Sequence, residues 1–154
     1  MKQRPKNVTD KLAIQFFPEG GTLVKGISSR VAFKAESREE GNVILEGAIY
    51  TKDGEKLTEI KTLHDGMGIF AYTPEEKPAV AKVVYKEKEY QFDLPDALPA
   101  GYVLNVNNSS GAIVGNVLSN RDTPDADIVA FISHEGRPYS YWVLRMRSGG
   151  NQTF

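Results

Sequence analysis

Cysteine is absent from the 154 residues of this chain, and histidine occurs only as His64 and His134. Without cysteine the chain can form no disulfide, thiolate nucleophile or thioester, and the common zinc-finger ligand sets are excluded. Two imidazoles also leave few ways to build a metal site or an acid–base pair. We therefore expect no cofactor and no metal ion.

Long apolar runs and an excess of one charge are missing as well. No stretch approaches the roughly 20 apolar residues of a membrane-spanning helix, and residues 1–7 lack the apolar segment of a signal peptide. Nineteen Lys and Arg balance 20 Asp and Glu, for a formal net charge of −1. This balance argues against a nucleic-acid surface and against direct membrane insertion. The apolar share of 40% suits a globular core instead.

The pattern of apolar residues is that of β-strands. Short runs rich in Val, Ile, Phe, Tyr and Thr alternate with clusters of Gly, Pro, Asp and Asn, and no segment of ten residues has a helical period. Val31, Phe33 and Ala35 share one face of a run whose other face is polar, as in a half-buried strand. Spacings of about 8–12 residues predict an immunoglobulin-like antiparallel β-sandwich. Its expected strands are residues 13–17, 29–35, 43–51, 57–63, 69–73, 79–85 and 89–94.

Two local features sharpen this prediction. Gly47 lies inside the expected strand 43–51, which indicates a bulge or a close approach of another backbone. Asp53 and Gly54 separate two expected strands, and both residue types accept the positive φ of a type I′ turn. The sequence therefore predicts a tight hairpin there.

Two prolines and a glycine within residues 94–101 predict a domain boundary. The β pattern then restarts, with strands expected at residues 102–106, 112–118, 127–133 and 139–147. Four strands are too few for a closed sandwich. The predicted organisation is a linker (1–12), a β-sandwich (13–98) and a partial second β-domain (99–154). Either the native chain continues, or these last strands dock on the first sandwich or on a second copy.

Candidate catalytic and metal-binding residues are few. His64 stands in a His-Asp-Gly turn, and Asp122, Asp125 and Asp127 follow one another closely, but turn chemistry explains the first and EF-hand spacing is absent from the second. No nucleophile elbow, phosphate-binding loop or dinucleotide fingerprint occurs. We predict no catalytic and no metal-binding residue, and hence no enzyme. A small hydrolase would need a cleft that places a histidine beside carboxylates.

The best surface candidate is the strand at 139–147. Tyr139 and Tyr141 fall on one face and Trp142 on the other, and both faces are apolar. One face packs on the core, so the other must meet the first domain, a further part of the chain, a partner protein or a sugar ring. We predict these three aromatic residues as the partner or ligand surface, with burial against a larger protein favoured over a sugar site.

Three runs carry a family resemblance: FFPEGG at 16–21, SRVAFKA at 29–35 and HDGMG at 64–68. Together they resemble macroglobulin-like domains, which occur in large bacterial alpha-2-macroglobulin-like and TonB-receptor-associated cell-envelope proteins. The resemblance covers about residues 13–106. It implies a scaffold of consecutive immunoglobulin-like sandwiches in the cell envelope or in a secreted protein. The family's Cys-Gln thioester has no counterpart in this chain.

These observations predict a non-enzymatic structural or interaction module of a larger cell-envelope or secreted protein. Its expected partners are other domains of a parent chain or separate proteins, and a homodimer through the incomplete second unit is a further candidate. The alternative is a carbohydrate-binding module that stacks sugars on Tyr139, Tyr141 or Trp142. Exposure of those rings on one face would distinguish the two.

Overall fold

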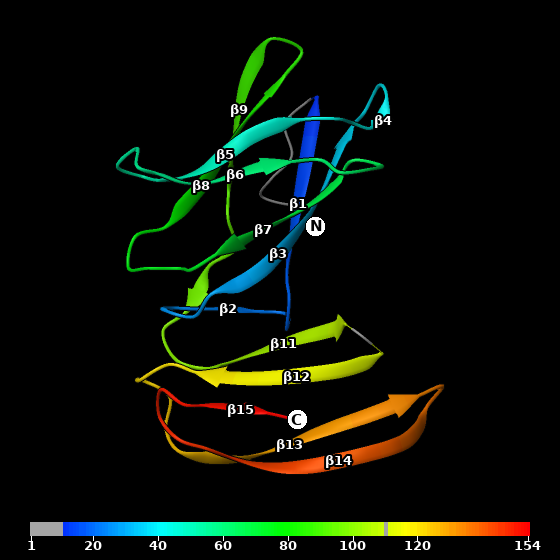
Figure 1. The fold of residues 1–154 in the computed structure, drawn as a ribbon. Helices are drawn as coiled ribbons and strands as arrows, with labels where there is room; N and C mark the ends of the chain where they lie inside the picture. The colour runs from blue at the N-terminus through cyan, green and yellow to red at the C-terminus, as the bar shows by residue number, and fades with distance from the viewer. Residues whose placement is uncertain (1–10, 110) are drawn as a thin grey trace, which may run out of the picture.

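The computed structural model describes residues 11–109 and 111–154, and in this range it contains strands and no helix. The all-β prediction is therefore confirmed, and no described segment is a helix that could cross a membrane. Most of the expected linker 1–12 lies outside the described residues. Figure 1 shows the strands in two stacked groups, β1–β10 above and β11–β15 below.

Two antiparallel sheets form the upper group. One consists of β1 (Leu12–Pro18), β3 (Ser29–Ser37) and β7 (Met67–Tyr72), with β4 (Gly41–Asn42) at the end of β3. The other has the order β6 (Lys56–Lys61), β5 (Glu46–Thr51), β8 (Ala79–Tyr85) and β9 (Lys88–Asp93). Alternate side chains of both sheets point into a shared core, as the period-2 pattern predicts. Its fully buried members include Ile14, Val31, Phe33, Ile49, Ala81 and Val83.

The FFPEGG run ends the first strand. Phe16 packs on the core, where its ring meets that of Phe70 edge-on at 6.2 Å, whereas Phe17 points outward and is 52% exposed. Pro18 is the last residue of β1, and Gly20 and Gly21 follow at φ 79° and 89°. The two phenylalanines thus straddle the strand, and the glycines supply the left-handed backbone of the turn.

Gly47 is a point of close backbone approach, as the sequence indicates. A Cβ at this position would overlap the carbonyl oxygen of Lys82 and the Cα of Val83 on the neighbouring strand. The bulge itself lies two residues later, between Ile49 and Tyr50. The observed strand is shorter than the predicted one (43–51), because β5 begins at Glu46 and the buried segment before it is irregular.

The predicted hairpin at Asp53-Gly54 connects β5 and β6, but its turn is not type I′. Only Gly54 has positive φ, at 93°, whereas a type I′ turn needs positive φ at both central residues. Thr51 closes the turn instead. Its carbonyl accepts a bond from Gly54 N at 3.0 Å, and its Oγ1 accepts one from Glu55 N at 3.1 Å.

The expected boundary segment contains a short strand. β10 (Ala97–Leu98) pairs in parallel with β2 (Leu23–Val24) and so remains attached to the upper group. Below it, β11 (Tyr102–Ser109), β12 (Ala112–Ser119) and β15 (Asn151–Thr153) form one sheet. β13 (Ala126–His134) and β14 (Arg137–Met146) form a separate hairpin. The polar strand β15 was not predicted. We call β1–β10 the first unit and β11–β15 the second unit. A small core of Val117, Ala130, Leu144 and Met146 lies in the second unit.

The second unit docks on the first through an apolar joint and a polar clamp. In the joint, Val24 and Ile27 pack against Val103, with Leu118 beside them. In the clamp, Glu19 accepts two bonds from the Arg30 guanidinium at 2.6 and 2.8 Å. The same two side chains bind both backbone groups of Val106. Its N–H donates to the Glu19 carboxylate at 3.1 Å, and its carbonyl accepts a bond from Arg30 at 2.5 Å. One strand edge of the second unit is thus held by an ion pair of the first.

The clamp predicts a pH dependence. The hydrogen bonds from Arg30, together with the Val106 N–H, hold the pKa of Glu19 below its ordinary value of 4.5, against the opposing effect of burial. Since the folded-state pKa is the lower one, this stability is fully present above pH 4.5 and is lost as the pH falls through the folded-state value. Both side chains are partly exposed, at 26% and 44%, so the contribution is screened to about 1 kcal/mol or less.

Thermal unfolding of wild type and Glu19→Gln between about pH 3 and pH 7, a window that includes the ordinary pKa of a glutamate, tests this. The wild type should be the more stable protein at neutral pH, and the difference should vanish in acid. Glu76→Gln is the matched control, because Glu76 pairs with Lys25 at 2.7 Å but is 86% exposed. If Glu19→Gln follows the wild type at every pH, the clamp contributes nothing.

Candidate interaction surface

The outer side of the β13–β14 hairpin is an exposed apolar surface. The strand register places Val129 opposite Val143 and Phe131 opposite Tyr141, so each pair shares one face. All four side chains are between 60% and 68% exposed. Tyr139 adjoins them at the bulge and is 78% exposed. We call these five residues the hairpin face.

The three aromatic residues predicted from the sequence are divided between the two sides of the hairpin. Tyr139 and Tyr141 belong to the hairpin face, whereas Trp142 lies on the inner side, with its ring 5.2 Å from that of Phe154. The pairing residues Val129 and Phe131 were missed. Their strand also has apolar residues at consecutive positions, which is the signal that could have identified them.

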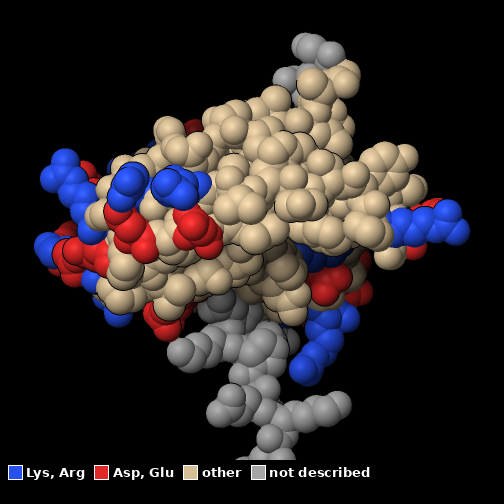
Figure 2. Space-filling view, turned by 90° about the horizontal axis from the view of Figure 1, so that it is seen from below, with Lys and Arg blue, Asp and Glu red and all other residues tan. Residues whose placement is uncertain are grey.

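Charged residues gather at the ends of this surface and leave its middle uncharged. Figure 2 views the molecule from below, where the hairpin is outermost, and shows a broad tan area with blue and red side chains at its margins. At one end Asp127 pairs with Arg145 at 3.4 Å and Asp125 with Arg147 at 2.6 Å. The bond from Arg147 and the backbone N–H of Ser148 lower the pKa of Asp125. These carboxylates are therefore engaged by arginines.

The two histidines are solvent-exposed and each directly precedes a turn. His64 Nδ1 lies 3.4 Å from the neighbouring Asp65 carboxylate, and His134 Nε2 lies 4.0 Å from that of Glu135. Each pair consists of sequence neighbours at a turn. Among the described residues, no group of three His, Asp or Glu side chains is arranged to hold a metal ion.

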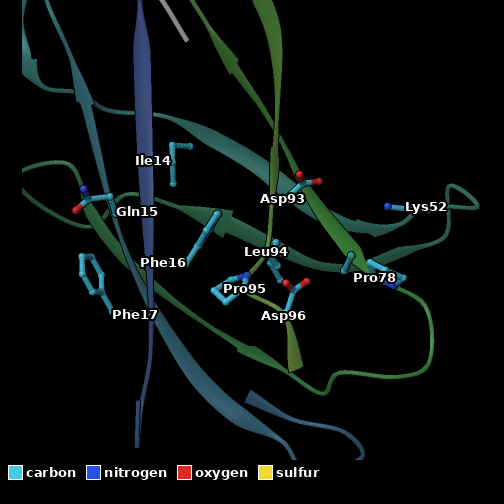
Figure 3. A pocket seen from close by; sticks show the side chains of 11 residues that line it. Ile14, Gln15, Phe16, Phe17, Lys52, Pro78, Asp93, Leu94, Pro95 and Asp96 are labelled. Atoms are coloured by element: carbon cyan, nitrogen blue, oxygen red, sulfur yellow. The ribbon is translucent and has the colours of Figure 1, made fainter. Parts of the chain in front are cut away.

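A groove of about 530 Å³ runs between β1 and the chain that leaves β9. Figure 3 shows Ile14 and Phe16 pointing from β1 toward Leu94, Pro95 and Asp96. Lys52 and Asp93 complete its charged lining. The described residues of the lining include no histidine and no hydroxyl side chain, so a serine–histidine pair is not assembled there.

Comparison with known proteins adds no assignment. The chain matches no protein-family model, no curated protein and no solved structure.

Proposed function

We propose that this chain is a non-enzymatic β-sandwich module that docks on an apolar β-sheet surface within a larger cell-envelope or secreted protein. The observation that carries the proposal is the hairpin face, which presents two tyrosines, a phenylalanine and two valines to solvent. Its exposed area is of the order of 500 Å², comparable with the largest patches on monomeric proteins, which are often functional.

The charge distribution supports protein docking. The hairpin face itself carries no charge, and the arginines at its end are paired with aspartates of the same chain. A neutral centre with a polar rim is the ordinary composition of a protein–protein interface, in which aromatic residues are enriched. Another domain of a parent chain, a separate protein or a second copy of this chain would each supply such a surface.

The compartment and the parent protein follow from the family resemblance. We propose that residues 13–98 are a macroglobulin-like, immunoglobulin-like domain and that residues 99–154 are part of a second one. The arrangement of the three runs supports this. The FFPEGG run ends β1, which pairs with β3, and β3 begins with the SRVAFKA run. The HDGMG run leads into β7, which pairs with the other edge of β3. The motifs thus lie on three adjacent strands of one sheet.

A double substitution, Phe131→Ser with Tyr141→Ser, tests the role of the hairpin face. Because both side chains are exposed, their replacement should change the free energy of unfolding by less than about 1 kcal/mol. Leu144→Ala, on the inner side of the same hairpin, should cost about 3 kcal/mol because Leu144 is buried. Urea denaturation of the three proteins measures both values.

Equal destabilisation by the two changes would contradict the proposal, because it would show that the hairpin face stabilises the fold of this chain. A retained fold would leave the double variant suitable for interaction assays. In those assays it should lose docking while the rest of the surface is unchanged.

A carbohydrate-binding module is the second candidate function. It is favoured by the exposure of Tyr139 and Tyr141, which lie two residues apart on one strand. Retention of the chain on insoluble cellulose or chitin, lost in Tyr139→Ala with Tyr141→Ala but kept in Phe131→Ser, would establish this function instead. Trp142 is not expected to contribute, because its ring packs on Phe154.

A further inference from the structure

A cavity of about 420 Å³ lies at the joint between the two units, away from the hairpin face. The β11–β12–β15 sheet turns one side toward the first unit. On that side, Val103 and Leu118 form the apolar joint, and the positions farther along the strands carry asparagines. Ser28 and Ser29, at the start of β3, line the opposite wall. We call this cavity the wedge.

Four asparagines and two serines line the wedge, beside Arg30, Ala71 and Leu118. Asn105 and Asn116 are direct cross-strand partners, and Asn151 lies opposite Leu118, so all of them share one face of the sheet. No carboxylate is among the described residues of the lining. Its polar side chains, apart from Arg30, are Ser28, Ser29, Asn105, Asn107, Asn116 and Asn151.

Two of these groups are buried without a hydrogen-bond partner. Ser29 is 2% exposed, and neither its Oγ nor the Oδ1 of Asn105 has a partner among the described residues. Buried polar atoms are nearly always satisfied, and leaving one unpaired is costly. Both residues line the wedge. The two oxygens are closed off from solvent, so a ligand in the wedge would pair with them after a change of side-chain rotamer.

The positive charge in the lining is already neutralised. Arg30 gives its Nε and one terminal nitrogen to Glu19 and also binds the Val106 carbonyl. An anion would have to compete with these bonds. The remaining polar groups of the lining are neutral amides and hydroxyls, which both donate and accept hydrogen bonds. One of their acceptors is in use, because Asn116 Oδ1 accepts a bond from Thr153 Oγ1 at 2.6 Å. These polar groups are suited to a neutral ligand with many groups that can both donate and accept a hydrogen bond.

We infer that the wedge binds a saccharide unit. A sugar ring carries a hydroxyl on nearly every carbon, and each hydroxyl can donate to an Asn Oδ1 or Ser Oγ and accept from an Asn Nδ2. Its C–H face can lie on the apolar surface of the lining, to which Ala71 and Leu118 contribute. An extended peptide offers only one amide for each residue and would leave most of these side chains unpaired.

Side-chain amide resonances provide the test. In ¹⁵N-labelled protein, we would titrate D-glucose, D-galactose, D-mannose and N-acetyl-D-glucosamine, with glycerol as an unmatched polyol. At least one sugar should shift the NH₂ signals of Asn105, Asn116 and Asn151 with a millimolar Kd, while glycerol shifts none. The NH₂ signal of Asn108, on the other face of β11, should not move.

Two variants make the result specific. Asn105→Ala should raise the Kd for the bound sugar at least about tenfold, because it removes a carboxamide whose oxygen is paired with none of the described residues. Ser29→Ala should weaken binding and leave the protein at least as stable, since its hydroxyl is unpaired. Asn108→Ala is the matched control and should bind like the wild type.

Three results would overturn the inference. The first is the absence of any shift at the wedge asparagines, which would mean that the wedge holds ordered water only. The second is an equal response to glycerol. The third is a set of shifts at Tyr139 and Tyr141 with none at the wedge, which would support the second candidate function and leave the wedge without a role.

Discussion

Replacement of Phe33 by alanine should lower the free energy of unfolding by about 4 kcal/mol. Phe33 is 1% exposed, lies at the centre of the sandwich core, and places its ring 6.3 Å from that of Phe70. Gly68 leaves room for this ring, because a Cβ on Gly68 would overlap it. The alanine variant therefore loses apolar contacts and leaves a cavity against rigid backbone. Guanidinium denaturation monitored by circular dichroism measures the change.

Phe17→Ala is the control for this prediction. Phe17 belongs to the neighbouring strand but faces outward and is half exposed, so its removal should cost about 1 kcal/mol or less. Similar losses for the two phenylalanines would contradict the assignment of inner and outer faces in the first sheet.

Gly47→Ala should destabilise the protein by about 3 kcal/mol, although it adds a single methyl group. The new Cβ would overlap backbone atoms of Lys82 and Val83, and backbone in the middle of a sheet cannot move aside cheaply. Gly115→Ala is the matched control, because the three atoms nearest to its Cβ would all belong to the ring of Phe154, the last residue of the sequence. That side chain can turn away, so the cost should be about 1 kcal/mol.

Differential scanning calorimetry of both glycine variants distinguishes these cases. A melting temperature for Gly47→Ala equal to that of Gly115→Ala would mean that β5 and β8 do not approach as closely as the structure shows.

Strong alternation made most of the larger strands predictable. β3 alternates buried apolar and exposed residues, and β8 is rich in Val and Ala. Both strands were expected within two residues of their observed ends. The segment before β5 shows the limit of this signal. Val43 and Leu45 are buried in irregular chain, and apolar character alone does not separate such a segment from a strand.

Strands of two or three residues were not predictable. β2, β4, β10 and β15 are too short to show a period, and they form because a neighbouring strand offers free backbone groups. The parallel pair of β2 and β10 joins residues that are distant in the sequence, Leu23 with Ala97 and Val24 with Leu98. Such pairing depends on the packed fold.

The candidate surfaces divide in the same way. Tyr139 and Tyr141 could be identified from one strand, because consecutive apolar positions leave one face without a core. Phe131 and Val129 lie on a strand with a similar apolar run, but only the hairpin register places them on the same face as the tyrosines. The wedge could not be foreseen, since its asparagines come from three strands and none forms a motif in the sequence.

Dye binding to the native protein tests the proposed docking role most directly. We would titrate 8-anilinonaphthalene-1-sulfonate into wild type, Phe131→Ser with Tyr141→Ser, and Leu57→Ser, a control at an exposed leucine of β6. The proposal predicts enhanced fluorescence with the wild type and the control and its loss in the double variant. Equal fluorescence from all three proteins would show that the hairpin face is not an apolar docking surface.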